Sequence, residues 1–120
     1  MRWSVAEVRV VNAERSHVLA ERARVASGAW ERAVGLLGSA NAGGGLFIEP
    51  CSSIHTCFMR FPIDVLFLDV DDTVLAVYSA FPAWRFTRWV RGARRVLELD
   101  AGAAGPTAVG DRLECQPCAS

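Results

Sequence analysis

The chain of 120 residues contains no lysine, so all thirteen of its basic residues are arginine. This absence excludes chemistry that depends on a lysine amine, such as Schiff-base formation. The thirteen acids bring the formal net charge at pH 7 to zero, so no overall field draws the protein toward nucleic acid or an anionic membrane. A Walker loop and a nucleophile elbow are also missing. These absences exclude several common classes of enzyme as the function of the chain.

Long apolar runs are missing as well. Runs such as Val65–Leu68 have the length of a buried strand and fall far short of the 18 or more residues that would span a bilayer. Glu7 interrupts the N-terminal region, where no apolar stretch follows a basic start, and this argues against a signal peptide. The sequence therefore predicts a cytoplasmic protein with no membrane partner, whose four cysteines are reduced thiols.

The composition and the hydrophobic pattern favour one domain over residues 1–120. With 52% hydrophobic and 22% charged residues, the chain is typical of a compact globule. Alternating or β-branched runs predict strands, and a serine followed by apolar residues at helical spacing predicts one helix. The expected strands cover 4–12, 17–25, 46–48, 63–69 and 73–79, and the expected helix covers 27–37. Residues 93–99 fit a strand or one helical turn, and a Gly-Asp turn at 110–111 leads into a last short strand.

So many strands with a single helix indicate a mainly β (α+β) fold. Because no second helix is available to connect parallel strands, we expect a small antiparallel sandwich or a partly open barrel with one short helix. The glycine-rich run at 38–45 is predicted to be a loop, since it precedes a strand instead of opening a phosphate-binding helix.

Residues 50–64 hold the greatest variety of reactive side chains in the chain. Within the Cys51–Asp64 segment lie an imidazole at His55, a carboxylate at Asp64 and two thiols. His55 and Asp64 are the catalytic candidates, because a carboxylate can orient an imidazole that acts as acid or base. The alternative is that both residues only satisfy backbone groups near a tight turn. The ligand-binding candidates are Ser53, His55, Met59, Arg60, Asp64 and Arg91.

The cysteines give no convincing metal or redox site. Cys115 and Cys118 form a single C-x-x-C motif at the end of the chain, and Cys51 and Cys57 are not spaced as its zinc-binding partner. A redox dithiol would need this motif at the start of a helix. Zinc binding, a redox role and incidental thiols stay open. We expect no metal and no cofactor, with residues 115–120 forming a frayed tail.

Five arginines and no acid lie between Thr73 and Glu98, beside Trp84, Phe86 and Trp89. Arginine interleaved with aromatics can bind nucleic acid, an anionic small ligand or a protein. The alternative is a solvated face whose arginines pair with the acids just upstream, at Asp64, Asp69, Asp71 and Asp72. The neutral net charge disfavours nucleic acid as a partner, so a small molecule or another protein is expected.

The run from Cys51 to Asp69, CSSIHTCFMRFPIDVLFLD, resembles the central signature of the prokaryotic domain-of-unknown-function family 192. The flanking blocks at 31–37, 44–48, 92–102 and 109–113 resemble the corresponding blocks of that family, so the likeness extends from about residue 5 to 114. The resemblance implies a compact, mainly β domain with a short helix. It implies no established activity, because the family is uncharacterised.

Two functions of different classes remain open. The first is a non-enzymatic ligand-binding or accessory domain with a pocket around the Cys51–Asp64 segment. The second is a small enzyme in which His55 and Asp64 perform acid–base chemistry while Arg60 or Arg91 holds an anionic substrate. The binding domain is favoured, because no second histidine lies near His55 in the sequence.

Overall fold

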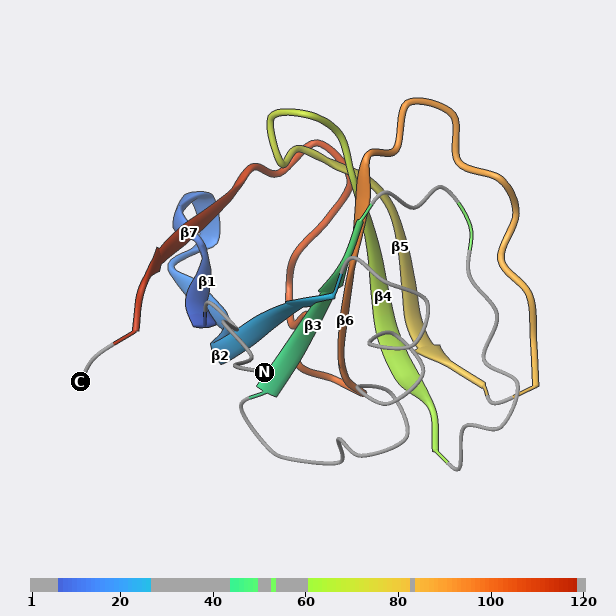
Figure 1. Cartoon of the computed structure of the whole chain (residues 1–120), viewed down its shortest axis with the longest axis horizontal. Coiled ribbons are helices and arrows are strands. Elements are labelled where there is room, and N and C mark those ends of the chain that lie inside the picture. The colour runs from blue at the N-terminus through green and yellow to red at the C-terminus, as the bar shows by residue number, and fades with distance from the viewer. Residues whose placement is uncertain (1–6, 27–43, 50–52, 54–60, 83, 119–120) are drawn as a thin grey trace, which may run out of the picture.

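Seven strands form a single curled sheet in the computed structural model, which describes residues 7–26, 44–49, 53, 61–82 and 84–118 (Figure 1). The strands are β1 (Glu7–Asn12), β2 (His17–Ala26), β3 (Gly44–Ile48), β4 (Ile63–Leu68), β5 (Val74–Phe81), β6 (Arg95–Asp100) and β7 (Leu113–Pro117). A 3-10 turn, η1 (Ala13–Arg15), joins β1 to β2. The mainly β prediction is confirmed, whereas the helix predicted over 27–37 lies outside the described residues.

The strand order across the sheet is β5-β4-β6-β3-β2-β1-β7, and the sheet curls into a half-barrel. Its two edge strands approach each other through a bridge between Thr73 and Arg112, next to β5 and β7. The backbone N–H groups of Val74 and Leu113 strengthen this approach by donating to the carbonyls of Asp111 and Asp72. The fold is therefore the partly open barrel, and not the sandwich, of the two predicted forms.

Five of the six neighbouring strand pairs are antiparallel, and β2 with β3 is the parallel exception. A parallel pair needs a connection of a dozen or more residues. Residues 27–43 supply that length, which the sequence pattern did not connect with a parallel pair.

The inner face of the sheet carries a hydrophobic core that draws on all seven strands. Phe47, Leu66 and Leu97 are fully buried at its centre. The remaining buried members are Val10, Leu19, Ala20, Ala23, Leu68, Val74, Leu99, Ala104 and Leu113. Because the sheet curls around this core, strands that are distant in the order share one apolar interior.

The outer face carries a second, smaller apolar cluster on β3, β4, β5 and β6. Its buried members are Leu46, Ile48, Ile63, Val65, Phe67, Ala93 and Val96. Tyr78 packs edge-on against Phe67 and Phe81, with ring centroids 5.9 Å and 5.1 Å apart. The six residues of β4 are all buried, because this strand contributes side chains to both clusters.

The end of the chain departs from the prediction of a frayed tail over residues 115–120. Residues 113–117 form β7 and pair in antiparallel register with β1, Val10 opposite Cys115. The prediction is wrong for residues 115–117, because their backbone groups complete the ladder that the edge of β1 would otherwise leave open. Among the described residues, no helix is both long enough and apolar enough to cross a membrane.

Candidate functional site

Three of the candidate residues from the sequence lie in the described part of the chain: Ser53, Asp64 and Arg91. Ser53 and Arg91 are both exposed, and Asp64 is buried on β4. The other candidates, His55, Met59 and Arg60, lie outside the described residues, as do Cys51 and Cys57. No described contact joins Ser53, Asp64 and Arg91 into one constellation.

Asp64 is buried, with 2% of its surface exposed, and its carboxylate accepts hydrogen bonds from backbone N–H groups. Oδ1 accepts a hydrogen bond from the N–H of Ala80 at 2.8 Å, and Oδ2 accepts from the N–H groups of Gly102 and Ala104 at 3.0 Å each. Ala80 lies near the end of β5, and the other two residues follow β6. The carboxylate therefore fixes the loop after β6 to the neighbouring hairpin, which fits the structural alternative that the sequence left open.

Glu98 was not among the candidates, and it is the least satisfied polar side chain that the structure describes. Only 4% of the residue is exposed, and neither carboxyl oxygen has a hydrogen-bond partner among the described residues. Burial raises the pKa of this carboxyl to about 8, since transfer out of water disfavours the charged form. At neutral pH Glu98 is therefore mostly protonated and able to donate a hydrogen bond as well as to accept one.

Strand pairing places Glu98 on the outer face. Its direct neighbours are Leu46 on β3 and Val65 on β4, and both belong to the outer cluster. Tyr78 on β5 stands opposite Val65 and continues the same row. Asp64 belongs to the adjacent position of β4, so its side chain leaves the other face of the sheet. The two buried carboxyls therefore occupy opposite faces.

One feature of the sequence points to Glu98. In the run Val96-Leu97-Glu98-Leu99, a single acid interrupts residues that would otherwise form a fully buried strand. Strand β6 contributes side chains to the apolar clusters on both faces of the sheet, so the acid has no exposed face to occupy. Only the position of β6 within the sheet distinguishes this acid from one on a half-exposed strand.

The contacts of Arg95, on β6, confirm in part the alternative that arginines of the arginine-rich stretch pair with upstream acids. Nε and Nη2 of Arg95 donate to the two carboxylate oxygens of Asp72 at 2.9 Å and 2.8 Å. The same guanidinium lies 4.0 Å from the centre of the Phe47 ring. Arg88, Arg91 and Arg94 are exposed and form no ion pair with a described carboxylate, so self-pairing does not extend to them.

The described cysteines and histidine do not belong to a group of side chains that could bind a metal ion. Among the described residues, no group of three or more histidine, cysteine, aspartate or glutamate side chains could hold a metal ion. Cys115 and Cys118 are free thiols, and His17 donates from Nε2 to the carbonyl of Ala103 at 2.9 Å. His17 is half-buried against Gly105, where a Cβ would lie 2.6 Å from the imidazole ring. This histidine therefore has a structural contact.

Residues 10–115 match the family DUF192, described as "Uncharacterized ACR", and the chain belongs to this family. Two crystal structures share the fold. One, from Sinorhizobium meliloti 1021 and described as a candidate transcription regulator, is 23% identical with a TM-score of 0.73, over 96% of each chain. The other, a protein of unknown function from Novosphingobium aromaticivorans DSM 12444, is 22% identical with a TM-score of 0.74, over 92% of this chain and 84% of that one. No curated protein matches the chain.

Proposed function

We propose that the protein is a non-enzymatic binding domain that holds a small, largely apolar molecule against the outer face of the sheet, beneath the Cys51–Asp64 segment. The observation that carries this proposal is the carboxyl of Glu98, buried among apolar side chains without a described partner. A buried polar group without a hydrogen bond costs stability, and such costs are concentrated at sites of function. A ligand with an N–H or hydroxyl group would supply the missing partner.

The ends of the Cys51–Asp64 segment support its position in the proposal. β3 and β4 lie on either side of β6, and each is antiparallel to it. Residues 49–62 therefore connect Ile48, opposite Val96, to Ile63, opposite the far end of β6 at Asp100. Phe61, near the end of this connection, packs against the outer cluster that surrounds Glu98. Phe61 and Ile63 thus place the described end of the segment on the same side of the sheet as the unpartnered carboxyl, which supports the proposed site.

The acid–base alternative draws less support from the described contacts. In that mechanism Asp64 orients His55, yet the described partners of Asp64 are three backbone N–H groups. Those bonds account for the burial of Asp64 without a catalytic role. His55 remains a candidate for contact with the ligand.

The test uses N-phenyl-1-naphthylamine, a neutral apolar probe whose fluorescence rises in apolar surroundings and whose N–H can donate to a carboxyl oxygen. We expect saturable binding at one site per chain at pH 7. Glu98→Leu removes the acceptor and should weaken binding about fivefold, the value of one ordinary hydrogen bond. Glu98→Gln keeps an acceptor oxygen and should bind within about twofold of the parent.

A matched control is Asp71→Ala, which alters an exposed acid in the β4–β5 turn and should leave probe binding unchanged. Probe binding that is not saturable would refute the proposal. Equal affinity of the parent and Glu98→Leu would refute it too, because the carboxyl would then take no part in binding.

A further inference from the structure

A run of arginines and aromatic residues follows β5 on the described surface, and two of its arginines, Arg88 and Arg91, form no ion pair with a described carboxylate. Residues Trp84–Arg91, here named the aromatic–arginine ridge, connect β5 toward β6 along one edge of the molecule (Figure 1). Between Thr73 and Glu98 the chain contains five arginines and no acid. The ridge is therefore a local positive surface on a chain whose formal net charge is zero.

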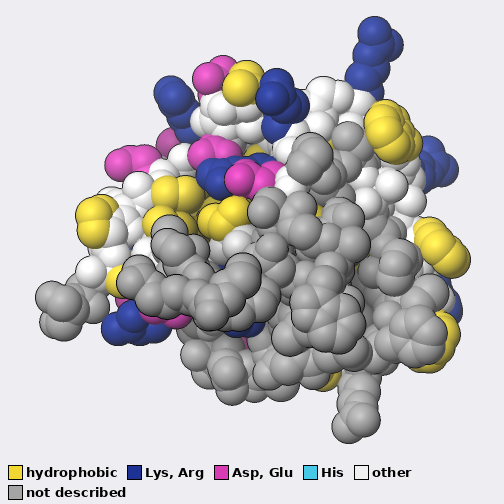
Figure 2. Space-filling view, in the orientation of Figure 1, with side chains coloured by type: hydrophobic (Ala, Val, Ile, Leu, Met, Phe, Trp, Pro, Cys, Tyr) yellow, Lys and Arg dark blue, Asp and Glu magenta, His cyan; other side chains and the backbone are white. Residues whose placement is uncertain are grey.

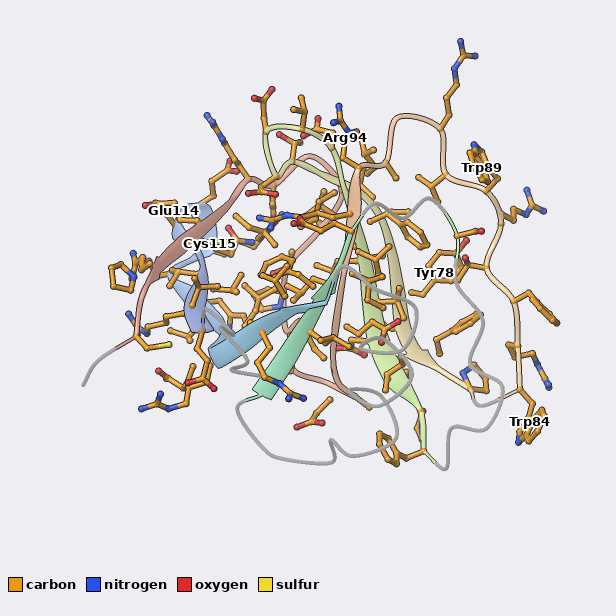
Figure 3. The ribbon with its side chains drawn as sticks, viewed as in Figure 1. Tyr78, Trp84, Trp89, Arg94, Glu114 and Cys115 are labelled. Atoms are coloured by element: carbon orange, nitrogen blue, oxygen red, sulfur yellow. The ribbon has the colours of Figure 1, made fainter. Side chains whose placement is uncertain are left out.

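The aromatic side chains of the ridge are exposed. Phe86 and Trp89 each have 75% of their surface accessible to water, and Trp84 has 56%. Figure 3 shows Trp84 and Trp89 at separate positions along the same edge, both directed away from the sheet. Figure 2 shows hydrophobic side chains along this edge with dark blue side chains between them. Three exposed rings in one short segment are more than scattered surface residues would give.

The backbone under these side chains is held in place. Thr87 and Ala93 are buried, and Val90 packs against the outer cluster, so the inward side of the segment is anchored. The N–H of Arg94 donates to the carbonyl of Leu68 at 2.8 Å, which ties the end of the segment to β4. The rings and guanidinium groups are thus presented from a fixed support, and binding would not have to order the segment first.

We propose that the aromatic–arginine ridge binds single-stranded nucleic acid, with bases stacked on Trp84, Phe86 and Trp89 and phosphates paired with Arg88 and Arg91. Rings and arginines alternate along the segment, as bases and phosphates alternate along a single strand. Trp89 follows Trp84 by five positions, a reach of at most about 17 Å. That reach suits a few successive nucleotides.

An anionic membrane also attracts arginine and tryptophan, but the distribution of the rings favours a strand. Insertion into a membrane interface needs an apolar surface that can be buried together, separate from the charged groups. In the ridge the arginines lie between the rings, so each ring has a cationic neighbour instead of an apolar one. This proposal is independent of the small-molecule site on the outer face.

The test measures fluorescence anisotropy of fluorescein-labelled 20-nucleotide oligothymidylate and oligouridylate with the full chain. We expect binding at 50 mM salt that weakens at least tenfold by 200 mM salt, because arginine–phosphate pairing releases counterions. Trp89→Ala should weaken binding at least fivefold through the loss of one stacking contact. Arg88→Gln/Arg91→Gln should reduce the slope of log affinity against log salt by about 1.4.

Two control variants match these changes elsewhere on the surface. Val109→Ala removes an exposed apolar side chain, and Arg22→Gln/Arg24→Gln removes two exposed charges from β2. Both should bind the oligonucleotides within twofold of the parent, and circular dichroism should show all variants folded. Vesicles of phosphatidylcholine with 30% phosphatidylglycerol serve as the competing surface.

Three results would overturn the proposal. One is the absence of oligonucleotide binding at 50 mM salt by the folded parent. Another is equal affinity for a duplex of the same length together with no effect of Trp89→Ala, since that pattern reflects charge without stacking. The third is binding to the vesicles that depends on Trp89 while the oligonucleotides do not bind, which would assign the ridge to a membrane.

Discussion

Asp64 and Glu98 are two buried carboxyls of one sheet, on neighbouring strands and opposite faces, and their surroundings differ completely. Three backbone N–H groups donate to Asp64. Glu98 has no described donor, and burial raises its pKa to about 8. Burial alone therefore does not decide what an acid does in this fold. Asp64 stabilises a loop by accepting these three hydrogen bonds, whereas Glu98 is kept largely neutral at a cost in stability.

The comparison extends to Asp111, a third buried acid at the open side of the barrel. It accepts hydrogen bonds from Asn12 Nδ2 and the N–H of Ala108, each at 2.9 Å, and from Nε of Arg15. The bond from Arg15, with those from Ala108 and Asn12, lowers the pKa of Asp111 to about 2. Like Asp64, it joins a loop to a distant strand. Satisfied acids are thus the structural ones in the described part of this protein.

The largest effect is expected from Asp64→Ala. The substitution leaves the N–H groups of Ala80, Gly102 and Ala104 without their acceptor, so the free energy of unfolding should fall on the order of 4 kcal/mol. Urea denaturation followed by circular dichroism measures it. Asp71→Ala, in the exposed turn, is the control and should stay within about 0.5 kcal/mol of the parent. A loss below about 1 kcal/mol would show that the hydrogen bonds to Asp64 contribute little to the stability of the fold.

Glu98→Gln should instead raise the free energy of unfolding. The pKa of Glu98 is raised in the folded state, so its contribution to stability is complete below about pH 4.5 and is lost as the pH rises toward 8. At pH 7 the uncharged glutamine should stabilise the fold on the order of 3 kcal/mol relative to the parent. Unfolding free energies between pH 5 and 9 should slope downward for the parent and be nearly flat for the variant. A flat profile for the parent would contradict the buried, unpartnered carboxyl.

Asp111→Asn should produce a smaller effect at the other end of the pH scale. The pKa of Asp111 is lowered in the folded state, so the stabilisation is present above about pH 4 and disappears as the pH falls toward 2. Melting temperatures of the parent should therefore drop across this range, and those of the variant should drop less. Glu114→Gln is a suitable control, because this acid is exposed on β7. Parallel melting curves for Asp111→Asn and the parent would contradict the pairing with Arg15.

The smallest effect on stability is expected from His55→Gln. If His55 contacts the ligand, the variant should unfold cooperatively within about 2 kcal/mol of the parent and lose binding of N-phenyl-1-naphthylamine. Thermal unfolding and the probe titration test the two parts separately. A variant that fails to fold would make His55 structural, in the same class as Asp64. A folded variant with unchanged probe binding would place the ligand away from His55.

The sequence predicted most strands, because apolar and β-branched residues recur along them in the pattern typical of a strand. Ile63–Leu68 forms where an apolar run predicts it, and the acidic turn at 69–72 joins β4 to β5. For residues 93–99 the sequence allowed a strand or one helical turn, and the structure has the strand Arg95–Asp100. In that turn Asp69 accepts from the N–H groups of Asp71 and Thr73 through its own side chain. Such local hydrogen bonds can be read from a few adjacent residues.

The candidate site was predicted less well. Asp64 stood out because a carboxylate in the same segment could orient His55, yet its described partners are backbone groups from β5 and from the loop after β6. Glu98 was missed, because a lone acid in an apolar run looks the same on an edge strand and on a central one. The pairing of Arg95 with Asp72 joins residues 23 positions apart, and the sequence indicated only that such a pairing was available.

By itself, the sequence determined the mainly β class, the position of most strands and the membership in DUF192, since these depend on local periodicity and on residues close together in the chain. Only the tertiary structure decided which acids are satisfied and which arginines stay exposed. The order of strands sets β6 between β3 and β4, which places Glu98 between the apolar side chains of Leu46 and Val65 and brings Gly102 to Asp64. The state of an ionisable group depends on the water and donors around it, and these come from segments that only the fold brings together.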